Sequence, residues 1–141
     1  MIAFTVPREP VPQPRHRIST HGGFARAYIP ATHAVHRYKA DIKEASMIAF
    51  GLGLPLLTCP LKVAAIFVMK RPQKFITAKH PQGRLWYDRA QDIDNFLKAL
   101  FDGITGMIWK DDCQVCDVHG LKYYAAIDEP PHTEVTIEEI R

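Results

Sequence analysis

The sequence predicts a single α+β domain over residues 1–141, built from a mixed β-sheet of about four to six strands and two main helices. The chain has 141 residues, which is enough for one hydrophobic core and too few for two comfortable ones. Segments with strand character, such as Ile2–Val6 and Leu61–Met69, are spread along the chain. Two segments with helical periodicity lie among them, from Thr32 to about Gly51 and from Asp92 to Ile104. Strands and helices in this arrangement are typical of an α+β fold.

The amino-terminal part of the chain is expected to form a strand and then a basic hairpin. The strand Ile2–Val6 ends at a proline-rich stretch, which cannot pair inside a sheet. Beyond it, His16–Thr20 and Phe24–Ile29 flank Gly22 and Gly23, which readily supply the positive φ angles of a tight turn. The arginines of this hairpin are suited to a phosphate backbone, and a solvated surface hairpin is an equal alternative. They are Arg15, Arg17 and Arg26.

The first long helix is expected to use Thr32 as its N-cap and to end near Gly51, because glycine favours helix ends. The strand Leu61–Met69 is nearly continuously apolar, which indicates burial on both faces or a central position in the sheet. Two later strands, Cys116–Ile127 and His132–Ile140, complete the sheet. The inward-facing candidates of the helix are Val35, Tyr38, Ala45, Ile48 and Ala49.

The segment 70–90 is expected to be a long, mobile and basic loop. Asp88 is its only acid, and it shows no apolar periodicity. A loop of this length in a small domain is usually functional or disordered, so we expect an arm that contacts DNA and orders on binding. Its aromatic residues Phe75, Trp86 and Tyr87 could stack on unpaired bases or anchor the loop to the core. The basic residues of the loop are Lys70, Arg71, Lys74, Lys79, Arg84 and Arg89.

The helix that begins near Asp92 carries the candidate chemistry. Its apolar residues share one face, while Asp94, Lys98 and Asp102 recur every four residues on the opposite side. A single aspartate at a helix start is most often a cap. Here two acids lie two residues apart and a second acidic pair follows, and such a set is tolerable when a divalent cation such as Mg²⁺ neutralises it. The second pair is Asp111 and Asp112, and the connection before it contains Gly103 and Gly106.

The same stretch resembles the signature of a known family. It reads Asp-x-Asp-Asn-x-x-Lys-x-x-x-Asp from Asp92 to Asp102, and then Ile-Trp-Lys-Asp-Asp-x-Gln-Val from Ile108 to Val115. These polar positions in a fixed apolar frame resemble the RusA family of Holliday junction resolvases. The strong resemblance extends from Asp92 to Asp117, and a weaker one covers most of the chain. The connection before the second acidic pair is about one residue shorter than in the family form.

The resemblance implies a metal-dependent active site. Three aspartates would act as the catalytic ligands of Mg²⁺, for which Mn²⁺ is a possible substitute. Lys98 would stabilise the charge of the transition state, and Asn95 would orient a carboxylate or a water. The three aspartates are Asp92, Asp94 and Asp112, with Asp111 as a supporting residue.

The resemblance also implies a substrate and an assembly. RusA-type resolvases are small, dimeric endodeoxyribonucleases, so we expect a homodimer that cuts four-way DNA junctions by paired symmetric nicks. Two matched nicks in a two-fold symmetric junction need two equivalent sites, which a C₂ homodimer supplies. A role in DNA recombination and repair, of phage or prophage type, is implied by the family alone. The alternatives are a broader nuclease of flaps and other branched DNA, and a non-catalytic DNA-binding module whose acids are caps.

Charge and cysteine content indicate the kind of partner, the cellular compartment and the absence of a zinc site. The formal charge of +3 is modest, but basic segments flank the acidic motif, as an enzyme acting on a polyanion would need. Three cysteines and no recognisable secretory or membrane-spanning segment indicate a cytoplasmic protein with reduced thiols and no membrane partner. Cys113, Cys116 and His119 give only half of a zinc pattern, so no zinc site is expected.

Overall fold

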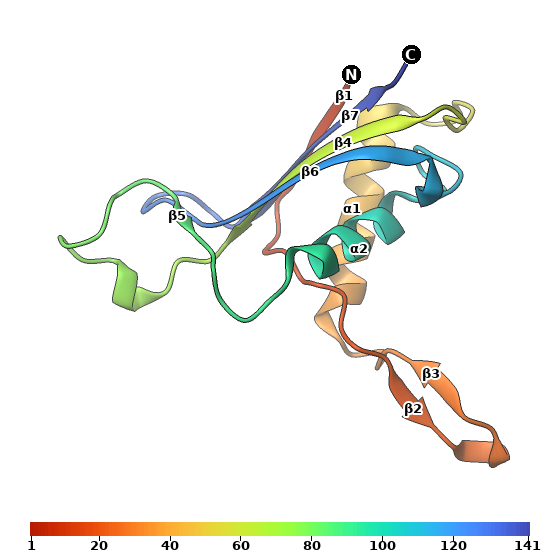
Figure 1. The fold of residues 1–141 in the computed structure, drawn as a ribbon, viewed down its shortest axis with the longest axis horizontal. Helices are drawn as coiled ribbons and strands as arrows, with labels where there is room; N and C mark the ends of the chain where they lie inside the picture. Colours follow the sequence, from red (N-terminus) through yellow and green to blue (C-terminus); the bar gives the residue numbers. More distant parts are fainter.

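The computed structural model describes residues 1–141, apart from the side chain of His21. A five-stranded sheet forms the centre of the molecule, in the order β1-β7-β4-β6-β5 (Figure 1). β6 runs parallel to β4, and the other neighbouring strands are antiparallel, so the expected mixed sheet is confirmed. The strands are β1 (Ile2–Val6), β4 (Leu61–Met69), β5 (Leu85–Trp86), β6 (Val115–Tyr124) and β7 (His132–Glu139).

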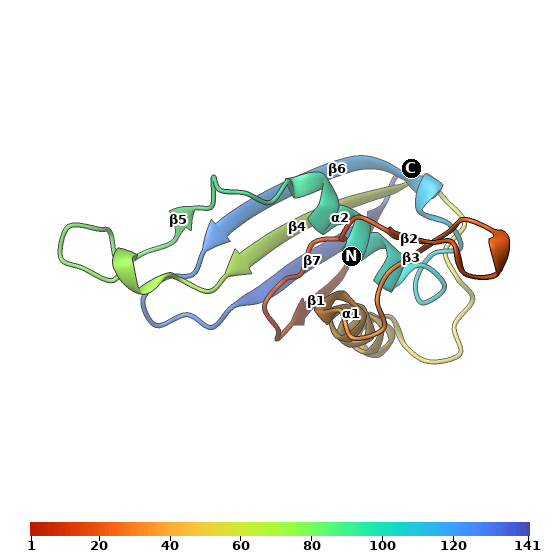
Figure 2. The same cartoon turned by 90° about the horizontal axis from the view of Figure 1, so that it is seen from below.

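Two helices, α1 (Ala34–Phe50) and α2 (Ile93–Ile104), cover one face of this sheet (Figures 1 and 2). The apolar stripe of α2 faces inward as its periodicity predicts, since Phe96 and Leu100 are fully buried. The Phe96 ring lies 5.2 Å from the ring of Phe67 on β4, measured between centroids. None of the described helices is long and apolar enough to cross a membrane.

The central strand β4 has the predicted bounds, but only one of its faces is fully covered. Val63, Ala65 and Phe67 are buried, while Ala64 and Ile66 on the other face are partly exposed. The continuous apolar run therefore reflects a central place in the sheet, and the prediction of burial on both faces holds only in part.

Three expectations for the helices were wrong in detail. The N-cap of α1 is His33 rather than Thr32, because the His33 ring nitrogen Nδ1 accepts a hydrogen bond from the Val35 amide at 3.1 Å. Ile48, which is 72% exposed, and its exposed neighbour Ala49 do not face the core. Gly103 lies inside α2 and not in the connection that follows it. A Cβ atom at Gly103 would approach the side chain of Ile42 on α1 to 2.6 Å, so glycine allows the two helices to pack closely there.

The predicted hairpin is confirmed as a two-stranded antiparallel ribbon of β2 (Arg17–Ser19) and β3 (Arg26–Tyr28). A short 3₁₀ turn joins the two strands, with Gly22 and Gly23 both at φ +81°. The ribbon projects away from the sheet and helices, at the opposite end of the molecule from the segment 70–90 (Figures 1 and 2).

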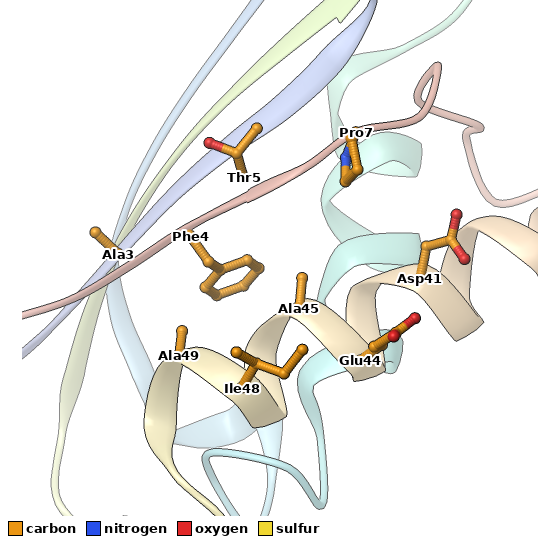
Figure 3. Close-up of a pocket in the computed structure, with 9 residues that line it drawn as sticks. All are labelled: Ala3, Phe4, Thr5, Pro7, Asp41, Glu44, Ala45, Ile48 and Ala49. Atoms are coloured by element: carbon orange, nitrogen blue, oxygen red, sulfur yellow. The ribbon is translucent and has the colours of Figure 1, made fainter.

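The first strand forms one edge of the sheet and lies beside α1. The Phe4 side chain points toward α1, where it shares a pocket of about 580 Å³ with Ala45 and Ile48 (Figure 3). The Thr5 side chain leaves β1 on the side opposite to Phe4 (Figure 3). The alternation of β1 thus brings an apolar ring against the partly exposed flank of α1.

The segment 70–90 contains more regular structure than its sequence predicts. It includes a 3₁₀ turn at Gln73–Phe75 and the two-residue strand β5. Leu85 and Trp86 of β5 pair with Tyr124 and Tyr123 of β6. The segment is therefore attached to the sheet at both its beginning and its end.

Candidate active site and nucleic-acid interface

The start of α2 presents two carboxylates to solvent. Asp92 occupies the N-cap position, but its side chain makes no capping hydrogen bond, and Asp94 lies exposed in the first turn. Within the described part of the chain, neither carboxylate has a hydrogen-bond or ion-pair partner. The free backbone N–H groups of a helix start favour negative charge, which explains why the fold tolerates both acids there. The two carboxylates remain free to bind a cation.

The basic amino-terminal segment lies directly against this helix. The Gln13 amide donates a 2.8 Å hydrogen bond to the carbonyl oxygen of Asn95. Gln13, Arg15, Asn95 and Lys98 line a common pocket of about 440 Å³. Lys98 is exposed one turn after Asp94, and none of the described acids forms an ion pair with it. Cationic and acidic groups from distant parts of the sequence are thus brought together at the start of α2.

Gln13 is a feature of this pocket that sequence reasoning did not single out. Its side-chain oxygen Oε1 is buried and, among the described residues, has no hydrogen-bond donor. A buried acceptor without a donor costs about 1–3 kcal/mol, so a water or ligand group that donates to it would be stabilised. The position gave no sequence signal because Gln13 lies in a proline-rich stretch with no recognisable motif.

One member of the second acidic pair caps a turn and the other does not. Asp111 caps a short 3₁₀ turn that begins at Asp112: its Oδ1 accepts a hydrogen bond from the Cys113 amide at 2.9 Å. This hydrogen bond lowers the pKa of Asp111. The pKa of Asp112 is raised, first by partial burial and then by the neighbouring Asp111 and by Asp102. Asp112 is therefore the member whose carboxylate is not used to cap the turn.

Gln114, the glutamine of the motif, has a structural role. Its Oε1 accepts hydrogen bonds from the backbone amides of Lys110 and Asp111, at 3.0 and 2.9 Å. Its Nε2 donates to the carbonyl oxygens of Leu57 and Cys59, at 2.8 and 3.2 Å. The side chain therefore fastens the acidic turn to the segment that leads into β4. Sequence reasoning identified the motif but missed this role.

The three aspartates predicted as ligands lie in two places. Asp94 and Asp102 are eight residues apart on one helix, which is about 12 Å along its axis, and Asp112 is close enough to Asp102 to feel its charge. Two oxygen ligands of one Mg²⁺ lie at most about 4.2 Å apart, twice the metal–oxygen distance. Among the described residues, Asp92, Asp94 and Asp112 do not form such a group. Asp102 itself forms a 3.1 Å ion pair with Lys39 of α1.

Another cluster has metal-ligand types but is already occupied by a cationic side chain. Glu129, His132 and Glu134 bring one ligand atom each to within 4.8 Å of the others. The Arg84 guanidinium pairs with Glu129 at 2.7 Å and with Glu134 at 2.6 Å. The hydrogen bond from Arg84 lowers the pKa of Glu129. We assign this cluster to the attachment of the segment 70–90 to the sheet.

Arg71 has a similar structural role. It is 6% exposed, and its guanidinium donates hydrogen bonds to the carbonyl oxygens of Phe75, Pro81 and Gly83 at 2.6 to 3.0 Å. These bonds close the segment 70–90 around a buried cation. Of the residues predicted to contact DNA, Arg71 and Arg84 therefore have their donors engaged within the protein.

The other predicted DNA contacts remain at the surface. Arg15, Arg17 and Arg26 are exposed on the amino-terminal segment and ribbon, without acidic partners among the described residues. Lys74 lies over the Phe75 ring at 5.0 Å. Arg89 pairs with Asp88 at 3.6 Å, with both side chains largely exposed. Lys70 and Lys79 complete the exposed set.

A small α+β domain with free carboxylates beside exposed cations is typical of enzymes that act on a polyanion. The comparison with known families agrees: the profile described as endodeoxyribonuclease RusA matches residues 7–138. The chain therefore belongs to the RusA family of endodeoxyribonucleases, and DNA is its substrate class. It is also 30% identical over 146 residues to the uncharacterized protein YqaN of Bacillus subtilis (strain 168), covering 99% of this chain and 96% of that protein.

Proposed function

We propose that the protein is a Mg²⁺-dependent endonuclease that resolves four-way DNA junctions by paired symmetric nicks. One observation carries the proposal: Asp92 and Asp94 are free carboxylates two residues apart at the start of α2, one turn before Lys98, in a chain of the RusA family. Free carboxylates that are not used as caps favour a catalytic role over a purely structural one. Membership of the RusA family favours a branched substrate over plain duplex.

The donors at the start of α2 fit a hard divalent cation. Mg²⁺ prefers one or two carboxylates, with waters and substrate phosphate oxygens completing its shell, and Asp92 and Asp94 supply this number. When bound, the ion would polarise the scissile phosphate and lower the pKa of the attacking water. Mn²⁺ accepts the same oxygen donors and is a possible substitute.

The remaining residues of the pocket would hold the DNA strand. Lys98 would place its ammonium beside the phosphoryl oxygens, where negative charge grows during attack. Arg15 lines the same pocket and would hold a neighbouring phosphate. The side chain of Asn95 would orient a carboxylate or a water, because its backbone position is already fixed by Gln13.

Asp112 is proposed as a further metal ligand, although within one chain its carboxylate lies near Asp102 and away from Asp94. A strong loss of cleavage in Asp112→Asn, with an intact fold, would show that the working assembly brings this carboxylate to the scissile phosphate. Normal cleavage in that variant would limit the metal ligands to Asp92 and Asp94.

The proposed assembly is a homodimer. A four-way junction is close to two-fold symmetric, so two identical sites related by a C₂ axis can nick strands of like polarity. Such an activity serves DNA recombination and repair, including that of phage or prophage origin. Size-exclusion chromatography with light scattering would measure the assembly directly.

The experiment that tests the function is cleavage of an end-labelled four-way junction, with and without Mg²⁺, beside linear duplex and flap substrates. Asp94→Asn removes the negative charge while keeping the size of the side chain and one of its oxygens. Asp128→Asn, in an exposed turn, is the matched control. We expect paired symmetric nicks that require Mg²⁺, persist in the control and vanish in Asp94→Asn.

Two results would contradict this proposal. Flaps cut as readily as junctions would identify a broader nuclease of branched DNA. Tight junction binding without cleavage in either Mg²⁺ or Mn²⁺ would identify a DNA-binding module without catalysis, whose binding weakens with salt.

A further inference from the structure

An exposed tryptophan stands on a rigid support at one edge of the sheet. Trp86 is 65% exposed, an unusual state for the largest apolar side chain. Its ring stacks on the ring of Tyr123, with centroids 4.6 Å apart and planes inclined by 21°. One face of the indole is therefore supported by protein while most of the side chain remains in solvent.

The backbone explains why this pair is fixed. Trp86 pairs with Tyr123 across β5 and β6, and its neighbour Leu85 is partly buried against the core. The Arg84 guanidinium lies 5.7 Å from the centre of the Tyr123 ring and is itself held by two ion pairs. An aromatic group held in this way loses little conformational entropy when a ligand stacks on it.

We propose that the Trp86–Tyr123 pair is a stacking platform for an unpaired base of the DNA substrate, an inference that rests on the proposed function. Every nucleobase offers a π-face, so stacking on a planar side chain needs no sequence recognition. The site is thus suited to the bases that become unstacked where DNA strands exchange at a branch point.

The charges around the platform favour a nucleic acid over an apolar partner. The acids nearby are neutralised, because Arg84 pairs with Glu129 and Glu134. Exposed cations of the adjoining segment would contact the phosphates on either side of a stacked base. They are Lys74, Lys79 and Arg89.

The chain path connects the platform to the proposed metal site. Asp92 lies six positions after Trp86 in the chain, a stretch that spans at most about 20 Å. The Lys122 ammonium donates a hydrogen bond to the Gln91 carbonyl oxygen and so holds this connection against β6. About 20 Å corresponds to about six base steps of 3.4 Å along one strand. A base on the platform would therefore lie within about six nucleotides of the scissile phosphate.

Tryptophan fluorescence provides a direct test, because the other tryptophan, Trp109, is fully buried. The full-length protein, in EDTA to prevent cleavage, is titrated with a single-stranded oligothymidylate and with a four-way junction that carries 2-aminopurine at the branch point. We expect both ligands to quench the exposed tryptophan and the junction to show quenching of 2-aminopurine. In Trp86→Phe, the remaining emission of Trp109 should not change, while stacking on the phenyl ring preserves most of the affinity.

The affinity of the variants completes the test. Trp86→Ala should weaken binding of the single strand and the junction by about 5- to 150-fold, the range seen when a stacking residue is removed. Leu52→Ala, an exposed apolar residue on a distant loop, should bind as the unchanged protein does. Circular dichroism verifies that both variants are folded.

Three results would contradict the proposal that Trp86 and Tyr123 form a stacking platform. They are unquenched Trp86 emission in the complex, equal affinity of Trp86→Ala, and a Trp86→Ala variant whose only change is its oligomeric state in light scattering. The last result would make the surface a contact between two copies of the chain. Quenching of Trp86 without junction cleavage would refute the proposed function and leave the platform standing, so the two failures are distinguishable.

Discussion

The close contact between α1 and α2 at Gly103 makes a quantitative prediction about the helix that carries the proposed ligands. A Cβ atom added there would lie 2.6 Å from Cγ2 and 2.8 Å from Cβ of Ile42, which is fully buried. Overpacking a core costs about 1–3 kcal/mol, and a contact close to the Ile42 backbone belongs at the upper end. Alanine returns about 1 kcal/mol of helix propensity. We therefore expect Gly103→Ala to lower the free energy of unfolding by about 2 kcal/mol.

A double-mutant cycle measured by urea unfolding tests this reasoning. Ile42→Ala alone should cost about 2–5 kcal/mol, because it leaves a cavity. In the double variant the new methyl group occupies part of that cavity, so the two effects should couple by at least about 1 kcal/mol. Gly83→Ala is the matched control, since a Cβ there meets nothing within 4 Å. A neutral Gly103→Ala, or strictly additive effects, would refute the steric explanation.

Three further predictions follow from the side chains around the site. Asp111→Ala should lower the midpoint of thermal unfolding because it removes a cap. Asp112→Ala should leave that midpoint unchanged and reduce Mg²⁺-dependent cleavage. Equal shifts of the midpoint in the two variants would contradict the assignment of the cap to Asp111 alone. Arg71→Met should cost about 1.5–3 kcal/mol in urea unfolding, because it removes the charged donor that binds the carbonyl oxygens of Phe75, Pro81 and Gly83, and a loss below about 1 kcal/mol would count against that role. Arg84 lowers the pKa of Glu129 in the folded protein, so the ion pair stabilises the fold above the ordinary pKa of 4.5 and this stabilisation is lost as the pH falls through the lowered pKa. The free energy of unfolding of the unchanged protein should therefore exceed that of Glu129→Gln by less and less between pH 6 and about pH 3. A difference that stays constant with pH would refute the role of this ion pair.

Hydrophobic periodicity predicted most of the fold because the strongest patterns coincide with the most buried elements. The bounds of β1 and β4 and the inward face of α2 follow from apolar spacing alone. The strand β5 escaped this reasoning because two residues cannot show a period. The N-cap of α1 was misplaced by one residue, since a histidine ring nitrogen can accept the same hydrogen bond as the hydroxyl of Thr32.

The sequence predicted candidate site residues, but it did not predict how far apart they lie. The spacing of Asp94, Lys98 and Asp102 correctly placed them on one side of one helix. Residues on the same side of a helix can nevertheless be too far apart along its axis to bind one ion. The rise of the helix separates the first and last of them by about 12 Å. The contact of Gln13 with Asn95 was invisible as well, because it joins segments far apart in the sequence.

The basic residues show why charge counted along a sequence overstates the surface available to DNA. Arg71 and Arg84 belong to the most basic segment, but their guanidinium groups are bound to carbonyl and carboxylate oxygens of the protein itself. Using either one for a phosphate would break those bonds and detach the segment 70–90 from the contacts that hold it. The free arginines lie instead at the amino terminus, where Arg15 reaches the pocket of Lys98. Electrostatic attraction of DNA should therefore rest on the amino-terminal arginines together with the exposed cations of the segment 70–90, and Arg15→Ala should reduce the salt dependence of binding by about one phosphate contact.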